Sequence, residues 1–86
     1  MFVRGKEKMT NEEIKNLADQ YLINTYGSRN LTLVRGKGTH VWDADGKEYI
    51  DLFSGIAVCN LGHGHPAVTQ TIIEQSQKLL HVSNLY

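Results

Sequence analysis

The sequence predicts an α/β fold in which a helix is followed by a three-stranded antiparallel meander, a glycine-rich loop and a second helix. Three observations support this order. A helix-capping motif with an apolar stripe comes first, alternating β-forming residues interrupted by turn dipeptides come next, and a His-Pro junction precedes the last apolar stripe. The chain has 86 residues, which is enough for one small domain at most.

The charge balance and the cysteine content limit the classes of function. Nine basic and nine acidic side chains cancel, so the charge predicts no binding to nucleic acid or to an anionic membrane. No apolar run is long enough to cross a bilayer. Cys59 is the only cysteine and cannot form an internal disulfide, and residues 1–9 lack the apolar core of a secretory signal. We therefore expect a cytoplasmic protein in which residues 1–9 form a flexible tail.

The first helix is predicted from a capping box. Thr10 and Glu13 have the spacing at which a hydroxyl and a carboxylate each bind a free amide at a helix start. The helix should begin at Asn11 and end near Asn24. Its apolar stripe, which we expect to pack against the rest of a protein, consists of Ile14, Leu17, Ala18, Tyr21 and Leu22.

Three strands are predicted from alternating segments rich in β-forming residues, at residues 31–35, 39–43 and 47–52. The first turn contains two glycines. The second contains Asp45-Gly46, a dipeptide typical of tight hairpins because both central residues of such a turn need positive φ. Trp42 and Tyr49 lie near this turn, and we expect both to cover one face of the sheet.

The segment from Asp51 to Pro66 is rich in glycine, which is seldom chosen for stability and indicates that a ligand or another backbone approaches closely. Pro66 suits the first position of a helix, and His65 before it suits the N-cap. The apolar face of this helix, predicted to have about four turns, consists of Val68, Ile72, Ile73, Leu79 and Leu80.

Three kinds of reactive residue are candidates for chemistry. Cys59, His63, His65 and His81 are possible metal ligands, but they lack the paired spacing of zinc sites, and the histidines also suit helix caps or the lining of a cleft. Cys59 lies in an apolar run and is predicted to be a buried filler. No lysine has the apolar surroundings of a Schiff-base nucleophile. A metal-binding domain therefore stays only an alternative.

From Tyr26 onward, about sixty residues resemble a known family without a gap. The residues that carry the resemblance are L-V-R-G-K-G-T-H-V-W-D-A-D-G-K-E-Y-I-D-L-F-S-G-I-A-V-C-N-L-G-H-G-H-P-A-V and H-V-S-N-L-Y. They are similar to the N-terminal part of class III pyridoxal-phosphate aminotransferases, and most similar to members that act on N-acetylornithine. The resemblance implies a fold-type I enzyme in which residues 10–86 are the incomplete N-terminal segment of the small domain, leading into the active-site cleft.

The reaction implied by the resemblance is the transfer of an amino group from N2-acetylornithine to 2-oxoglutarate in arginine biosynthesis, by a homodimer with bound pyridoxal 5'-phosphate. Ornithine, succinylornithine and 4-aminobutyrate aminotransferases of the same family are alternatives. So is a small interaction module without catalytic activity.

The resemblance also implies roles for individual residues. Tyr26 matches a tyrosine near the substrate, and Ser54, Gly55 and Ile56 match the substrate-side wall of the cleft. Tyr26 could equally be a packing aromatic at a helix end. The alternative for Ser54, Gly55 and Ile56 is a strand-to-loop bend with ordinary packing.

Further along the chain, the resemblance implies that His63 and His65 form a structural turn and helix cap, and that Asn84 and Tyr86 approach a dimer interface. The family's phosphate-binding segment, its pyridine-facing aspartate, its carboxylate-binding arginine and its Schiff-base lysine have no counterpart in these 86 residues. We therefore expect a longer parent protein that binds the cofactor mainly elsewhere, and an 86-residue chain that is inactive alone.

Overall fold

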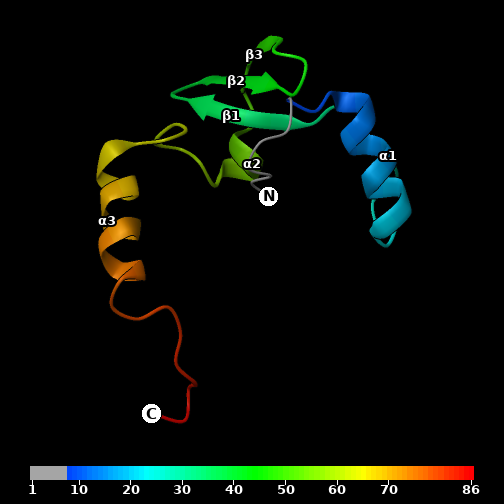
Figure 1. Ribbon diagram of the computed structural model, residues 1–86. Coiled ribbons are helices and arrows are strands. Elements are labelled where there is room, and N and C mark those ends of the chain that lie inside the picture. Colours follow the sequence, from blue (N-terminus) through cyan, green and yellow to red (C-terminus); the bar gives the residue numbers. More distant parts are fainter. Residues whose placement is uncertain (1–7) are drawn as a thin grey trace.

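A computed structural model describes residues 8–86, and its elements follow the predicted order (Figure 1). The predicted tail lies almost entirely outside these residues. One element is additional, a short helical turn inside the predicted glycine-rich loop. The elements are α1 (Asn11–Tyr21), β1 (Leu33–Lys37), β2 (His40–Asp43), β3 (Glu48–Ile50), α2 (Ser54–Ala57) and α3 (Pro66–Ser76).

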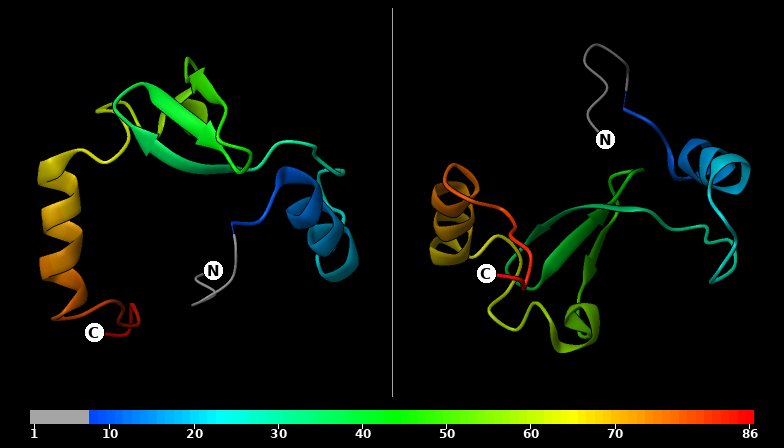
Figure 2. Two further views of the ribbon diagram at one scale, coloured as in Figure 1. Left: turned by 45° about the horizontal axis from the view of Figure 1, so that its top comes forward. Right: turned by 90° about the horizontal axis from the view of Figure 1, so that it is seen from below.

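The helices α1 and α3 lie on opposite sides of the sheet and extend away from it, as the views from different directions show (Figures 1 and 2). The radius of gyration is 16.1 Å. A tightly packed chain of this length would have a radius of about 12 Å. The arrangement is therefore open, and most apolar side chains of the helices remain exposed.

The predicted capping box is present at the start of α1. The Thr10 hydroxyl accepts a hydrogen bond from the Glu13 amide at 3.2 Å, and the Glu13 carboxylate accepts one from the Thr10 amide at 2.8 Å. The helix ends at Tyr21, before the predicted Asn24, because Leu22 is already extended with φ −101° and ψ 144°. Tyr21 and Leu22 are exposed, so the described residues cover only part of the apolar stripe.

The three strands form an antiparallel sheet of order β1-β2-β3, which confirms the meander. The prediction that Trp42 and Tyr49 cover one face is wrong. Tyr49 is paired with Val41, the neighbour of Trp42, and neighbouring residues of a strand point to opposite faces. Trp42 instead shares its face with Arg35, whose guanidinium carbon lies 3.9 Å from the centroid of the Trp42 ring.

The interior near the second hairpin turn is small and partly polar. Val41 and Ala44 are buried, with exposed fractions of 5% and 4%, and so are the polar residues Asn11 and Asp43. The Asn11 side-chain amide donates to Asp43 at 3.1 Å and to Asp45 at 3.0 Å, and its oxygen accepts from the Ala44 amide at 3.3 Å. These hydrogen bonds fasten the start of α1 to the turn between β2 and β3.

The buried carboxylate of Asp43 is well supplied with donors. It accepts hydrogen bonds from the Tyr49 hydroxyl and the Lys47 amide, both at 2.8 Å, in addition to the bond from Asn11. Burial acts to raise the pKa of Asp43, but the hydrogen bonds outweigh it, and the pKa lies below its ordinary value. Asp43 is therefore an ionised acceptor in the interior.

The last helix, α3, begins as predicted. Pro66 occupies its first turn, and the His65 ring accepts a hydrogen bond from the Ala67 amide at 3.3 Å. The helix has 11 residues, about three turns instead of the predicted four. Leu79 and Leu80 follow its end, so they do not extend the helical apolar face. In the described part of the chain, no helix combines the length and the apolar character that crossing a membrane requires.

Candidate functional site

The predicted wall residues Ser54, Gly55 and Ile56 lie in α2, which has the opposite hand from an ordinary helix. Their φ angles are 52°, 60° and 62°, and Ala57 follows with 59°. Left-handed helical residues other than glycine cost about 1–2 kcal/mol each because Cβ crowds the following carbonyl. The structure thus replaces the predicted loop by a strained turn, and strain of this kind persists only where surrounding contacts enforce it.

The turn is closed by its own backbone. The Ser54 carbonyl accepts hydrogen bonds from the amides of Val58 at 2.8 Å and Cys59 at 2.9 Å. The Ala57 amide donates to the Phe53 carbonyl at 3.1 Å. None of the residues of α2 is buried, so packing contributes little to holding the turn.

Asp51 connects the turn to the rest of the structure. One carboxylate oxygen accepts hydrogen bonds from the amides of Phe53 at 2.9 Å and Ser54 at 2.8 Å. The other lies 2.6 Å from the His63 Nε2 atom. The hydrogen bond with His63, followed by those from Ser54 and Phe53, lowers the pKa of Asp51 to about 2. Asp51 is therefore ionised at neutral pH.

His63 is itself fixed to the turn between β1 and β2. Its backbone exchanges hydrogen bonds with Gly38 in both directions, at 2.8 and 2.9 Å, as an isolated antiparallel bridge. A Cβ atom added to Gly36 would lie 2.6 Å from the Cβ and Cγ atoms of His63. Glycine at this position therefore lets the histidine lie against the strand, which agrees with the predicted structural role of His63.

A hollow of about 60 Å³ lies between these groups. Its lining includes Asp51, Ser54, Cys59 and His63. Cys59 is only half-buried, so the prediction of a buried filler is wrong, because the apolar run around it belongs to an exposed turn. Within residues 8–86 no three histidine, cysteine or acidic side chains gather where they could hold a metal ion.

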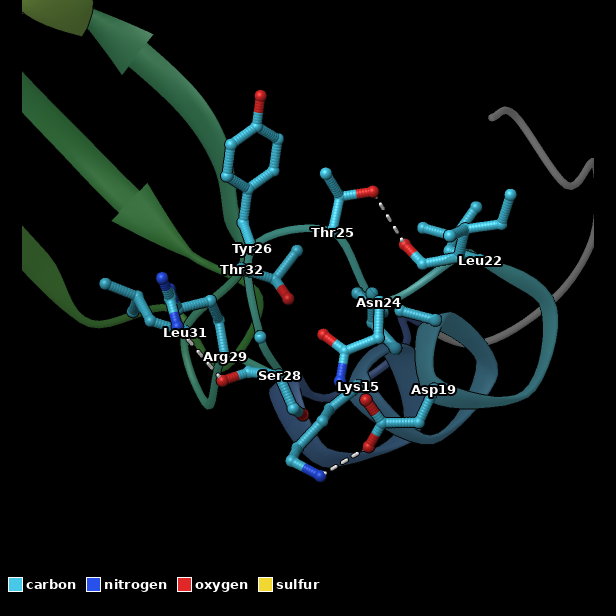
Figure 3. A pocket seen from close by; sticks show the side chains of 14 residues that line it. Lys15, Asp19, Leu22, Asn24, Thr25, Tyr26, Ser28, Arg29, Leu31 and Thr32 are labelled. Atoms are coloured by element: carbon cyan, nitrogen blue, oxygen red, sulfur yellow. Dashed lines mark hydrogen bonds and ion pairs between the residues drawn. The ribbon is translucent and has the colours of Figure 1, made fainter.

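Tyr26, the remaining predicted site residue, lines a second hollow of about 520 Å³ between α1 and the segment that follows it (Figure 3). On this hollow's helical side Lys15 and Asp19 form an ion pair of 2.6 Å. Tyr26 is 85% exposed and lines a different hollow from Ser54. The described residues therefore do not bring the four predicted substrate contacts into one cavity.

Two of the described lysines are engaged with other side chains. Lys15 is paired with Asp19, and the Lys47 ammonium lies 5.1 Å from the centroid of the Tyr49 ring. Sequence reasoning missed Asp51, although an aspartate two residues before Phe53 has the spacing of an Asx turn and could have indicated the amide contacts.

Comparison with known proteins places the chain in a family. Residues 22–86 match the family described as aminotransferase class-III. The match covers more than half of the chain, which therefore belongs to this family of enzymes. An acetylornithine aminotransferase of Synechocystis sp. is 52% identical over 68 residues, which are 79% of the chain and 16% of that protein. The chain thus spans about a sixth of the length of this relative.

Solved structures agree with the family and with the predicted fold class. An acetylornithine aminotransferase from Elizabethkingia anophelis superposes with a TM-score of 0.81 at 32% identity, covering 90% of the chain and 19% of that structure. Ornithine delta-aminotransferase of Plasmodium falciparum superposes with a TM-score of 0.82 at 29% identity, covering 91% of the chain and 20% of that structure. The predicted α/β arrangement of a fold-type I aminotransferase is confirmed.

Proposed function

We propose that the chain works as the N-terminal segment of the small domain of an acetylornithine aminotransferase. The observation that carries the proposal is the identity of 52% to an enzyme of that name. The family match over residues 22–86 includes the stretch from Asp51 to Pro66. In this proposal a full-length cytoplasmic homodimer moves an amino group from N2-acetylornithine to 2-oxoglutarate and serves arginine biosynthesis. Neither nucleic acid nor a membrane takes part.

Pyridoxal phosphate would supply the electron sink of the reaction. The described residues do not form a complete site for it, because Lys15 and Lys47 are engaged elsewhere and the other described lysines, Lys8, Lys37 and Lys78, are exposed. We therefore place the cofactor mainly on residues outside the chain. The contribution of this segment is to bind and orient the substrate.

The geometry of α2 supports a substrate-facing role for Ser54, Gly55 and Ile56. The Ile56 side chain is 75% exposed, so the described residues leave its surface free for a ligand. A Cβ added to Gly55 would meet only a Val58 side-chain atom at 3.9 Å, so nothing nearby crowds that position. The φ of 60° at Gly55 favours glycine by itself, and the open space beside it leaves room for a substrate. The exposed Tyr26 ring would contact the same substrate once the remaining walls are present.

An ornithine aminotransferase is the second candidate, since an enzyme of that name superposes equally well. Specificity within such a family depends on few contacts, each worth little unless it leaves a buried polar group unpaired. The region of the chain shared by both enzymes therefore cannot decide the amino donor by itself.

The test is to extend the reading frame beyond the codon for Tyr86, purify the full-length protein and compare kcat/KM for N-acetylornithine, ornithine and 4-aminobutyrate with 2-oxoglutarate. We expect N-acetylornithine to be the preferred donor. The 86-residue chain alone is the control and should be inactive. Preference for another donor would overturn the specific assignment. A reading frame that stops after Tyr86, with a chain that unfolds cooperatively as a monomer, would overturn the proposed enzyme altogether.

A further inference from the structure

We propose that Asp51 is a positioning residue, which holds the left-handed turn of α2 in place through its contacts with Ser54 and His63 and so sets the substrate wall. The claim that this turn forms a substrate wall rests on the function proposed above. The claim that Asp51 holds the turn in place does not depend on that function, and it can be tested separately.

The two oxygens of Asp51 act on two different parts of the chain. Oδ1 accepts the amides of Phe53 and Ser54, the residues that lead into the left-handed turn. Oδ2 lies 2.6 Å from His63, which is 12 residues further along. The carboxylate therefore links the entrance of the turn to the segment that returns from it.

The far end of this link is attached to the sheet by backbone hydrogen bonds. His63 exchanges backbone hydrogen bonds with Gly38, and Gly38 lies at the turn between β1 and β2. The backbone of Asp51 is tied to the same turn, since its amide donates to the Thr39 carbonyl at 2.8 Å. Asp51 and His63 together therefore fix the position of α2 relative to the β1–β2 hairpin.

The turn needs such an external hold. Ser54, Ile56 and Ala57 all have φ angles that side chains disfavour, and the turn buries none of its residues. Within residues 8–86, the side chain that binds the amides entering the turn is that of Asp51. Without the Asp51 side chain, the turn would relax to an ordinary loop conformation because this relieves the backbone strain, and Ile56 would leave its present position.

The first measurement is hydrogen exchange at the Val58 and Cys59 amides, which close the turn on the Ser54 carbonyl. It compares full-length wild type with Asp51→Ala and Asp51→Asn. The matched control is Glu74→Gln, which also removes one negative charge, from the exposed face of α3. We expect exchange about tenfold faster in D51A and unchanged in E74Q. D51N keeps an acceptor oxygen and should lie between wild type and D51A, and it remains informative if D51A does not fold.

The second measurement is steady-state kinetics of the same full-length proteins. A displaced wall should lower kcat/KM for the amino donor by about tenfold to a hundredfold in D51A, with a smaller loss in D51N and none in E74Q. A merely stabilising residue would instead leave KM of the folded fraction unchanged.

The two measurements separate the inference from the proposed function. Equal exchange at Val58 and Cys59 in D51A, D51N and E74Q would overturn the hold on the turn, whatever the enzyme does. Faster exchange with unchanged kcat/KM for the folded enzyme would overturn the link between the turn and the substrate. Faster exchange in a protein that transaminates no donor would support the hold and overturn the proposed function.

Discussion

The side-chain nitrogen of Asn11 lies 3.1 Å from a carboxylate oxygen of Asp43, and both residues are buried although they are 32 positions apart in the sequence. This pair joins the first turn of α1 to the end of β2. It also means that the interior of this region depends on satisfied hydrogen bonds as well as on apolar contacts. A buried polar group that loses its partner costs more than the bond contributed.

Replacing Asn11 with alanine should therefore destabilise the folded protein by about 1–3 kcal/mol. The substitution removes the donor to Asp43 and the acceptor that binds the Thr32 amide at 3.0 Å. Urea unfolding followed by circular dichroism measures the change. Asn16→Ala, an exposed position on the same helix, is the control and should cost nothing. Equal unfolding midpoints for N11A and N16A would contradict a structural role for the pair.

Replacing Tyr49 with phenylalanine should change how stability depends on alkaline pH. The hydrogen bond to Asp43, together with burial, raises the pKa of Tyr49 above its ordinary value of 10.0. A raised pKa gives stability that is complete below the unfolded pKa and is lost as pH rises through the folded one. The difference in unfolding free energy between wild type and Y49F should thus shrink above about pH 10.

Urea unfolding midpoints from about pH 8 to about pH 11, a range that spans the ordinary tyrosine pKa, measure that difference. Tyr21→Phe is the control for removing a hydroxyl, since Tyr21 is largely exposed. A constant difference between wild type and Y49F over this range would show that the bond to Asp43 is absent in solution.

Sequence reasoning succeeded where the determinants are local. The bonds between Thr10 and Glu13 span three residues, and the cap of His65 on α3 spans two. Both follow from short-range chemistry that a motif encodes. The end of α3 was harder to predict, because no glycine follows Ser76 closely and the last turn of an unpacked helix is set by weak preferences.

The contacts that position the candidate site were not predictable in the same way. Asp51 and His63 meet because the hairpin brings Gly38 to the histidine, which is a property of the folded sheet. The left-handed turn carries no pattern that predicts it, since Ile56 and Ala57 are residues that normally avoid positive φ. Strained sites are where local rules are expected to fail.

Acid should break the hydrogen bonds that Asp51 accepts from the Phe53 and Ser54 amides at the entrance of α2. A lowered pKa gives stability that is present above the unfolded pKa, near 3.8, and lost as pH falls toward the folded value of about 2. The amide proton signals of Phe53 and Ser54 should therefore shift together with a midpoint of about 2. The Leu79 amide, which donates to the Gln75 carbonyl, is the internal control. A midpoint near 4, the ordinary aspartate range, would refute the bond to His63.

Gly36→Ala should destabilise the protein by about 1–3 kcal/mol through a clash with His63. The added Cβ would lie 2.6 Å from two atoms of that side chain. Gly46→Ala is the control, because a Cβ there meets nothing within 4 Å and suffers only from its φ of 87°. Combining each substitution with His63→Gly separates the two effects, because glycine removes both of the atoms that the added Cβ would meet. The clash predicts that G36A and H63G are less than additive, whereas G46A and H63G add within about 0.5 kcal/mol. Additivity in both pairs would refute the contact.

Ile56→Gly tests whether the strained turn is held for the substrate. Glycine accepts the φ of 62° without a steric cost, and the exposed Ile56 side chain loses little burial. Relief of the strain stabilises the folded protein, whereas the greater freedom of glycine in the unfolded chain offsets part of this gain. The net stabilisation should be about 1 kcal/mol. Ala57→Gly relieves the same strain at φ 59° and keeps the Ile56 side chain, so its gain in stability should be similar.

The two variants should differ only in selectivity. If Ile56 shapes the substrate wall, I56G of the full-length enzyme will lose about tenfold of its discrimination between N-acetylornithine and ornithine, measured as a ratio of kcat/KM values. A57G should keep the wild-type ratio, because the side chain that faces the substrate is intact. If both variants gain stability and both keep the ratio, then the turn is strained for another reason and Ile56 is not a specificity residue. The strain would then have to be explained by the connection between Asp51 and the sheet alone.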